Sequence, residues 1–171
     1  AVAGYGFGIS GLVAGLVLVP FSALGFIGGK LVPWLRERLV PAIILAWGGM
    51  AVLTALVLFA LARAQLWISF AVMGLLGLGV GVFSASMPAA ILAVTPNEET
   101  SSAMSFNQII RSVGFSMGSA LGGLILAAYT SIESKFPTNS GYTMASWLGA
   151  AAMGITVVSA FALRRTSQSA K

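Results

Sequence analysis

Arg111 is the side chain with the clearest potential for chemistry, because it is the only charge well inside a predicted helix. A charge within a bilayer is costly and marks a functional site by default. Roughly 25 Å of helix separates Arg111 from Tyr129, which places Arg111 near one boundary of the membrane. There it can reach water or pair with Glu98 or Glu99. We therefore expect Arg111 to hold a structural or gating ion pair rather than to bind substrate.

The residues around Arg111 form two stripes on one predicted helix. Gly114, Gly118 and Gly122 recur at every fourth position and share a face with Arg111, where small residues let two helices approach closely. A second stripe lies about 80° round the helix, at ~100° per residue. This stripe predicts the polar wall of a cavity, although serines in membrane helices also bond the carbonyl one turn back. It consists of Gln108, Ser112, Phe115 and Ser119.

Other kinds of catalytic and metal chemistry lack the residues that they need. The chain has no cysteine, histidine or aspartate, and its four acids fall between the apolar stretches: Glu37, Glu98, Glu99 and Glu133. These facts exclude a metal cluster, a serine–histidine–aspartate set, a phosphate-binding lysine loop and an intramembrane acid pair. We therefore expect no enzyme activity, no metal and no other cofactor.

Five long uncharged stretches must position these residues, at 1–29, 39–62, 64–97, 112–132 and 136–163. Each can supply the ~20 apolar residues that cross a bilayer. Hydrophobic residues make up 58% of the chain and charged residues 8%, so the lipid bilayer must cover its surface. The predicted fold is all-α: one polytopic membrane helix bundle over residues 1–171, with spans at 7–30, 41–62, 66–94, 103–128 and 143–163.

The basic residues predict how this bundle is oriented. One end collects Lys30, Arg36, Arg38, Arg164, Arg165 and Lys171, and the other only Arg63 and Lys135. Positive charge prefers the cytoplasmic side, so we expect the tail at residues 164–171 to be cytoplasmic and Ala1 to lie outside. The net charge of +5 thus indicates orientation and no nucleic-acid partner. Because the chain lacks an initial methionine and enters its first span at once, we expect a fragment of a longer protein.

Glycine and proline mark two of the predicted spans. Gly77 and Gly81 lie in the glycine-rich middle of the third span, and Pro88 follows. Proline removes a backbone donor and clashes one turn back, so Pro88 predicts a bend near Ser84, and Pro20 a similar bend in the first span. These residues indicate either a hinge, as in a rocking or gating transporter, or close packing between helices.

The first break on the basic side carries interleaved charges. Residues 29–38 form a predicted tight turn that contains Arg36, Glu37 and Arg38. Such charges can lock neighbouring spans in one transport state. The alternative is an ordinary positive loop on the cytoplasmic side.

Four segments carry a family resemblance, and they occur in the family's order. They are residues 15–20 (GLVLVP), 29–33 (GKLVP), 77–81 (GLGVG) and the stretch from Pro96 through Asn107, Arg111, Gly114 and Gly118 to Gly122. With these segments the chain resembles the C-terminal half of a major facilitator superfamily transporter, and in particular the drug:proton antiporter branch with fourteen spans. The resemblance covers nearly the whole chain, as the last five spans of that family.

This resemblance implies a role for each span. The third would line a central cavity, the first and fourth would contact the N-terminal half of the same transporter, and the second and fifth would face lipid. Methionine and phenylalanine suit varied apolar substrates because they re-pack at low cost, with simple apolar packing as the alternative. The implied cavity residues are Met73, Phe83, Ser84 and Met87, faced by Gln108 and Met117.

The chain departs from that family in two respects. Pro33 and Trp34 stand where the family's loop has an acid followed by arginine, so only the charges at residues 36–38 remain to form a lock. No predicted span holds an acid or a histidine, although a proton-coupled transporter needs a titratable group in the membrane. Coupling must therefore come from another part of the protein.

The predicted function is secondary transport by alternating access. We expect a multidrug efflux antiporter of the plasma membrane, which exports lipophilic or cationic small molecules in exchange for protons. The alternatives are a metabolite permease of the same superfamily and a non-transporting scaffold subunit of five spans. Packing glycines suit the scaffold equally well, whereas a bent third span and a polar stripe favour transport.

Overall fold

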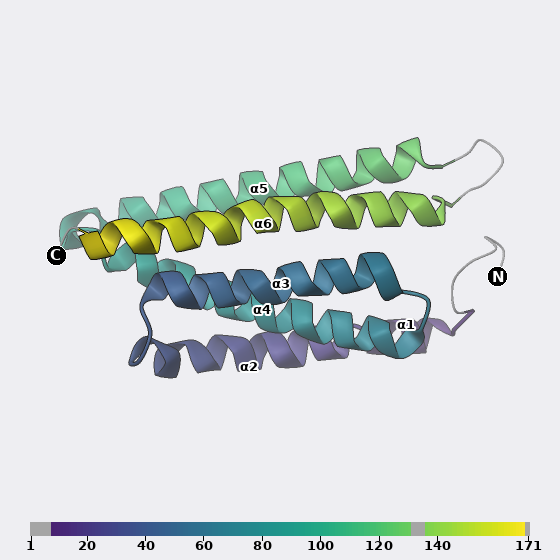
Figure 1. Ribbon diagram of the computed structural model, residues 1–171, viewed down its shortest axis with the longest axis horizontal. Helices are drawn as coiled ribbons and strands as arrows, with labels where there is room; N and C mark the ends of the chain where they lie inside the picture. Colours follow the sequence, from purple (N-terminus) through teal and green to yellow (C-terminus); the bar gives the residue numbers. More distant parts are fainter. Residues whose placement is uncertain (1–7, 131–135, 170–171) are drawn as a thin grey trace.

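Long helices that lie roughly along one axis dominate the structure (Figure 1). The computed structural model describes residues 8–130 and 136–169. In these ranges the only β-type pairing is a single bridge between Thr130 and Pro137. The helices are α1 (Gly11–Leu16), α2 (Val19–Arg36), α3 (Pro41–Ala62), α4 (Leu66–Leu92), α5 (Thr100–Ala128) and α6 (Asn139–Ser169), and a 3₁₀ turn, η1 (Asn97–Glu99), precedes α5.

Five helical segments are long and apolar enough to cross a membrane. The predicted all-α bundle with five spans is therefore confirmed. The segments are Gly11–Arg36, which combines α1 and α2, then Pro41–Ala62, Leu66–Leu92, Asn97–Ala128 and Asn139–Ala162.

The first span extends further than predicted. The prediction ends it at Lys30, whereas α2 continues to Arg36 and the turn falls at residues 37–40. Pro33 lies inside this extension and removes only one hydrogen bond from the helix. Val32 is buried and clusters with Ile44 of α3. This packing keeps the last turns of α2 helical, and most of the predicted tight turn is helix.

Pro20 breaks the same span near its start. Helix α1 ends at Leu16, and α2 begins at Val19. The carbonyl of Leu16 lies four residues before Pro20, so it loses its usual donor and meets the proline ring. The bend predicted at Pro20 is therefore a break between two helices.

Other boundaries differ from the predictions as well: the first span begins at Gly11 instead of residue 7, and α4 ends at Leu92 instead of residue 94. Helix α5 begins at Thr100 instead of residue 103, and α6 begins at Asn139 instead of residue 143. Helix α6 also continues to Ser169, so the predicted tail is helical up to that residue. Several residues used in the predictions lie outside the described part of the chain: Ala1, Phe7, Glu133, Lys135 and Lys171.

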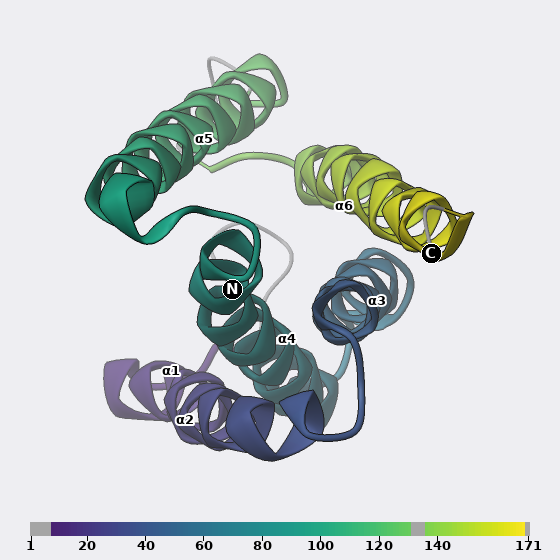
Figure 2. The same ribbon diagram turned by 90° about the vertical axis from the view of Figure 1, so that its left-hand side faces the viewer.

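Helix α4 lies at the centre of the bundle, between α2 and α3 (Figure 2). Glycines bring these three backbones together. A Cβ atom on Gly81 would collide with the carbonyl oxygen of Gly25 in α2, and one on Gly79 would lie 2.7 Å from the carbonyl oxygen of Gly48 in α3. Small residues are needed here because any side chain would separate the helices.

The other two helices are packed to different degrees. Helix α6 lies along α3, where a Cβ on Gly49 would come within 2.8 Å of Cγ2 of Val157. None of the residues of α5 is buried, and its contacts are mainly with α6. Figure 2 shows α5 at the edge of the bundle, well apart from α2.

Arg63 ties the end of α3 to the start of α6. Its Nε donates to Oδ1 of Asn139 at 2.8 Å, and its Nη2 donates to Oγ1 of Thr143 at 2.6 Å and to the carbonyl of Asn139. The guanidinium also lies 5.7 Å from the centre of the Phe59 ring. One arginine thereby fixes the spacing of two helices at this end of the bundle.

We predict that Gly81→Ala lowers the thermal stability of the protein. The added methyl group would meet the Gly25 backbone and push α2 from α4, and overpacking of this kind costs about 1–3 kcal/mol. Thermal unfolding in detergent, followed by far-ultraviolet circular dichroism, measures the loss. Gly154→Ala is the matched control, because its Cβ would meet nothing within 4 Å. Equal melting temperatures for the two variants would contradict the packing account.

We predict that Arg63→Ala loosens the first turn of α6. The variant removes hydrogen bonds from a charged donor, each of which makes a net contribution of about 1.5–3 kcal/mol to stability. Hydrogen exchange of the amides at residues 143–147, whose helical acceptors lie at the start of α6, should accelerate. Arg36→Ala is the control, because Arg36 is the last residue of α2 and its side chain is exposed. Unchanged exchange in Arg63→Ala would show that apolar packing alone holds α6 in place.

Candidate substrate cavity

A cavity of about 460 Å³ lies among α3, α4, α5 and α6. Figure 2 looks along the bundle and shows how the backbones of these four helices are arranged. The space exists because α5 makes few contacts with α4 and is joined to the bundle mainly through α6. The lining residues are Val52 of α3, Val80, Phe83, Ser84 and Met87 of α4, Arg111, Gly114 and Phe115 of α5, and Met153 and Thr156 of α6.

The walls of the cavity are mainly apolar, with a few polar groups among them. Thr156 donates its hydroxyl proton to the carbonyl of Ala152 at 3.1 Å, so its oxygen can only accept from a ligand. Pro88 has no N–H, so the carbonyl of Ser84 lacks its usual helical donor, although α4 continues through Pro88 to its end. An apolar hollow with a few polar groups is typical of small-molecule sites.

Arg111 supplies the only charge among the lining residues. Its guanidinium carbon lies 5.9 Å from the centre of the Phe115 ring, and its side chain is half-buried. Within the described ranges it forms no ion pair with Glu98 or Glu99. The helical rise explains this, because Glu99 lies about 18 Å along the axis from Arg111. The structure therefore does not bring the predicted pair together.

A comparison with known families decides what kind of protein carries this cavity. A family model described as Major Facilitator Superfamily matches residues 2–171. The chain belongs to this superfamily. With five helices able to span a bilayer, this superfamily member is a multi-pass membrane transporter and not an enzyme. No curated protein and no solved structure matches the chain, and the family match is to the superfamily as a whole.

Only some of the cavity residues implied by the resemblance line the cavity of this transporter. Phe83, Ser84 and Met87 do, whereas Met73, Gln108 and Met117 do not. Met73 shares a face of α4 with Val80 but lies about 10 Å further along the helix. Met117 is outside the cavity because, at ~100° per residue, it points about a third of a turn away from the lining face of α5.

Helices α3 and α6 also contribute to the cavity, although the resemblance assigns them to lipid. Val52 comes from α3, and Met153 and Thr156 come from α6. Nothing in the sequence distinguishes Val52, because α3 is apolar around most of its circumference. In the sequence, Met153 and Thr156 indicate a cavity only weakly, because they are merely a flexible and a polar side chain in the middle of a predicted span.

The charges between α2 and α3 do not form a lock in this structure. Arg36, Glu37 and Arg38 are exposed, and in the described part of the chain no ion pair joins the glutamate to either arginine. Instead the guanidinium of Arg38 lies 4.9 Å from the centre of the Trp34 ring. Trp34, which stands where the family has an arginine, thus contacts the charged side chain of Arg38.

The glycines of α4 and α5 are used differently in the transporter. A Cβ on Gly77 would collide with the backbone of Phe21, so this glycine lies at a close helix contact. A Cβ on Gly114, Gly118 or Gly122 would meet nothing within 4 Å. Close packing therefore occurs at the glycines of α4, while the glycine face of α5 is open.

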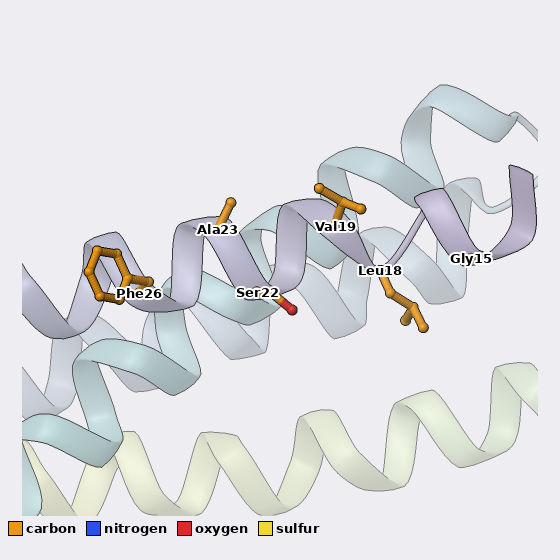
Figure 3. A pocket seen from close by; sticks show the side chains of 6 residues that line it. All are labelled: Gly15, Leu18, Val19, Ser22, Ala23 and Phe26. Atoms are coloured by element: carbon orange, nitrogen blue, oxygen red, sulfur yellow. The ribbon is translucent and has the colours of Figure 1, made fainter. Parts of the chain in front are cut away.

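A second hollow of about 520 Å³ lies along α1 and α2 and is lined by Gly15, Leu18, Val19, Ser22, Ala23 and Phe26. All of these residues come from one helical segment, so the hollow is a surface groove. Figure 3 shows the side chains of Leu18 and Ser22 pointing to one side of the helix and those of Val19 and Ala23 to the other. Ser22 is its only polar side chain, which makes it a weaker candidate for a ligand site than the cavity beside Arg111.

We predict that Ser84→Cys reacts with a small thiol reagent, because Ser84 lines the cavity. Ser86→Cys is the matched control, since Ser86 is 1% exposed and its hydroxyl donates to the carbonyl of Val82 at 2.6 Å. Buried thiols are inert, so we expect labelling of the control to be slower by about tenfold or more. Timed labelling with peptide mass spectrometry measures both rates, and the chain has no other cysteine. Equal rates would argue against an accessible cavity.

Proposed function

We propose that this transporter exports drug-like small molecules by alternating access and that the cavity among α3, α4, α5 and α6 holds them. The observation that carries the proposal is the cavity itself. Its volume of about 460 Å³ lies within the range of roughly 300–1,000 Å³ that accommodates small ligands. Phe83, Met87, Phe115 and Met153 offer it flat and flexible apolar surfaces, which adapt to different substrates.

The partner of this bundle is proposed to be the N-terminal half of the same transporter, docked on α2 and α5. Helix α5 exposes a row of large apolar side chains, and the groove on α1 and α2 lies on an exposed face of those helices. Exposed apolar helix faces are suited to lipid or to another helix bundle. The apolar residues exposed on α5 include Phe106, Ile109, Ile110, Val113, Leu121 and Leu124.

Proton coupling is proposed to depend on a titratable group in another part of the protein. The glutamates that the structure describes, Glu37, Glu98 and Glu99, are exposed and lie outside the long helices. In the described residues, no three side chains of His, Cys, Asp or Glu gather into a metal site. A bilayer-embedded proton carrier is therefore needed in addition to this bundle.

The orientation proposed from charge places the end of the bundle with the α2–α3 turn in the cytoplasm. Lys30, Arg36 and Arg38 lie at this end, and α6 carries Arg164 and Arg165 toward it (Figure 1). Arg63 lies at the other end and is bonded to α6. The positive-inside rule then makes the C-terminus cytoplasmic in a plasma-membrane protein.

We predict that Met87→Ala impairs export of a lipophilic dye, N-phenyl-1-naphthylamine, from vesicles that contain the protein made from its complete gene. The variant loses the apolar contact that the half-buried Met87 side chain would make with the dye, so KM for the dye should rise by about three- to tenfold. Met73→Ala is the matched control, because Met73 is on the same helix but outside the cavity. Dye efflux under a pH gradient, with and without a protonophore, is the measurement.

Each outcome of this assay has a definite meaning. Efflux that is lost with the protonophore and weakened only in Met87→Ala supports coupled export through this cavity. Efflux that ignores the protonophore contradicts proton coupling. Equal effects of the two methionine variants contradict the assignment of the cavity. Efflux no greater than in protein-free vesicles contradicts drug export and leaves the metabolite permease and the scaffold.

A further inference from the structure

We propose that the cavity selects amphipathic anions, with Arg111 binding the acidic group and the apolar wall holding the rest of the molecule. This inference rests on the proposed function, because it assigns the ligand class of the same cavity. It departs from the expectation that Arg111 holds an ion pair and that the substrates are lipophilic or cationic.

The first step concerns the charge of Arg111. The guanidinium is always ionised, and no acidic side chain lines the cavity. Its position on α5 puts it within a membrane-spanning segment, where an unpaired charge is unfavourable. The Phe115 ring at 5.9 Å compensates only in part, because a ring face carries no net charge. A bound anion would supply the missing counter-charge.

The second step concerns the hydrogen bonds of Arg111. A guanidinium has five N–H donors in a fixed fork and no acceptor, and it matches a carboxylate or sulfonate through two parallel bonds. Among the described residues, no side chain or carbonyl accepts a hydrogen bond from Arg111. The fork is therefore available to a ligand. Arg63 shows the contrast, because its Nε and Nη2 donate to Asn139 and Thr143.

The third step concerns the shape of the ligand. Opposite Arg111, α4 contributes Phe83 and Met87, and α6 contributes Met153. These side chains require an apolar body attached to the acidic group. A cation would meet the like charge of Arg111 with no acidic side chain among the lining residues that the structure describes, so repulsion would disfavour its binding. The same residues therefore favour amphipathic anions and reject cations of equal size.

Equilibrium binding of tritiated 2-naphthoate tests this proposal, with the protein made from its complete gene and purified in detergent. The competitors are 2-naphthamide, which is neutral, and 2-naphthylmethylammonium, which is a cation with the same ring. We expect the anion to bind about ten- to a hundredfold tighter than the amide, the range expected of a charged bidentate contact. We expect the ammonium compound to compete least.

Variants of Arg111 assign the preference to this residue. Arg111→Gln should abolish the preference for the anion, and Arg111→Lys should keep part of it, because lysine retains the charge but not the fork. Lys30→Gln is the matched control: Lys30 also lies over an aromatic ring, that of Phe26 at 5.5 Å, but does not line the cavity. This control should bind all three compounds as the wild type does.

A second readout leaves Arg111 intact, in case its replacement impairs folding. Gly114→Cys places a thiol on the cavity wall, where a Cβ meets nothing within 4 Å. Bound 2-naphthoate should slow maleimide labelling of this thiol, and the amide at the same concentration should slow it much less. Equal protection by the two compounds would overturn the anion preference without any change at Arg111.

The outcomes separate this proposal from the proposed function. Equal binding of the ammonium compound and 2-naphthoate would overturn the anion class, and an anion preference that persists in Arg111→Gln would overturn its assignment to Arg111. If Met87→Ala then still binds these compounds more weakly than the wild type, the cavity remains the binding site and the proposed function is unaffected. Absence of binding by all three compounds, together with no effect of Met87→Ala on dye efflux, would overturn both.

Discussion

The close approach of α4 to α2 and α3 is the contact on which the rest of this bundle depends. Lipid is as apolar as the helices, so the hydrophobic effect does not drive them together, and van der Waals contact between backbones must do so. Gly81 meets Gly25 on one side of α4, and Gly79 meets Gly48 on the other. Because these contacts fix the rotation of α4, they also fix the direction in which Phe83 faces the cavity.

Helix α5 is held in the opposite way, and the cavity follows from this difference. None of its residues is buried, and its glycine face meets no neighbour in the described structure. Local stability follows the density of buried contacts, so α5 is the least tightly packed of the long helices within this bundle. Arg111 and Phe115 lie on this loosely packed wall, and Phe83 lies on the wall that glycine contacts hold firmly. One firm and one loosely held wall suit a site that opens and closes during transport.

Several features of the site follow from the sequence, and others do not. Phe83 and Met87, which the resemblance assigns to a substrate cavity, share one face of α4 and line the same hollow, while their contact with substrate stays a prediction. Arg111 was predicted to form an ion pair with Glu98 or Glu99. It lines the cavity without such a pair, because these glutamates lie too far along the helix axis to contact its guanidinium. The sequence could not decide between hinge and packing for Gly77, because both uses require the same small residue.

The sequence by itself determined the number of spans and their helical nature. Both depend on local properties: the length of an apolar run and the need to satisfy backbone groups in lipid. Only the tertiary structure decided which helices meet, that α3 and α6 share the cavity with α4 and α5, and that Arg111 faces it with no ion-pair or hydrogen-bond partner among the described residues. Helical periodicity shows which residues share a face, but the neighbour that each face meets depends on packing between distant segments.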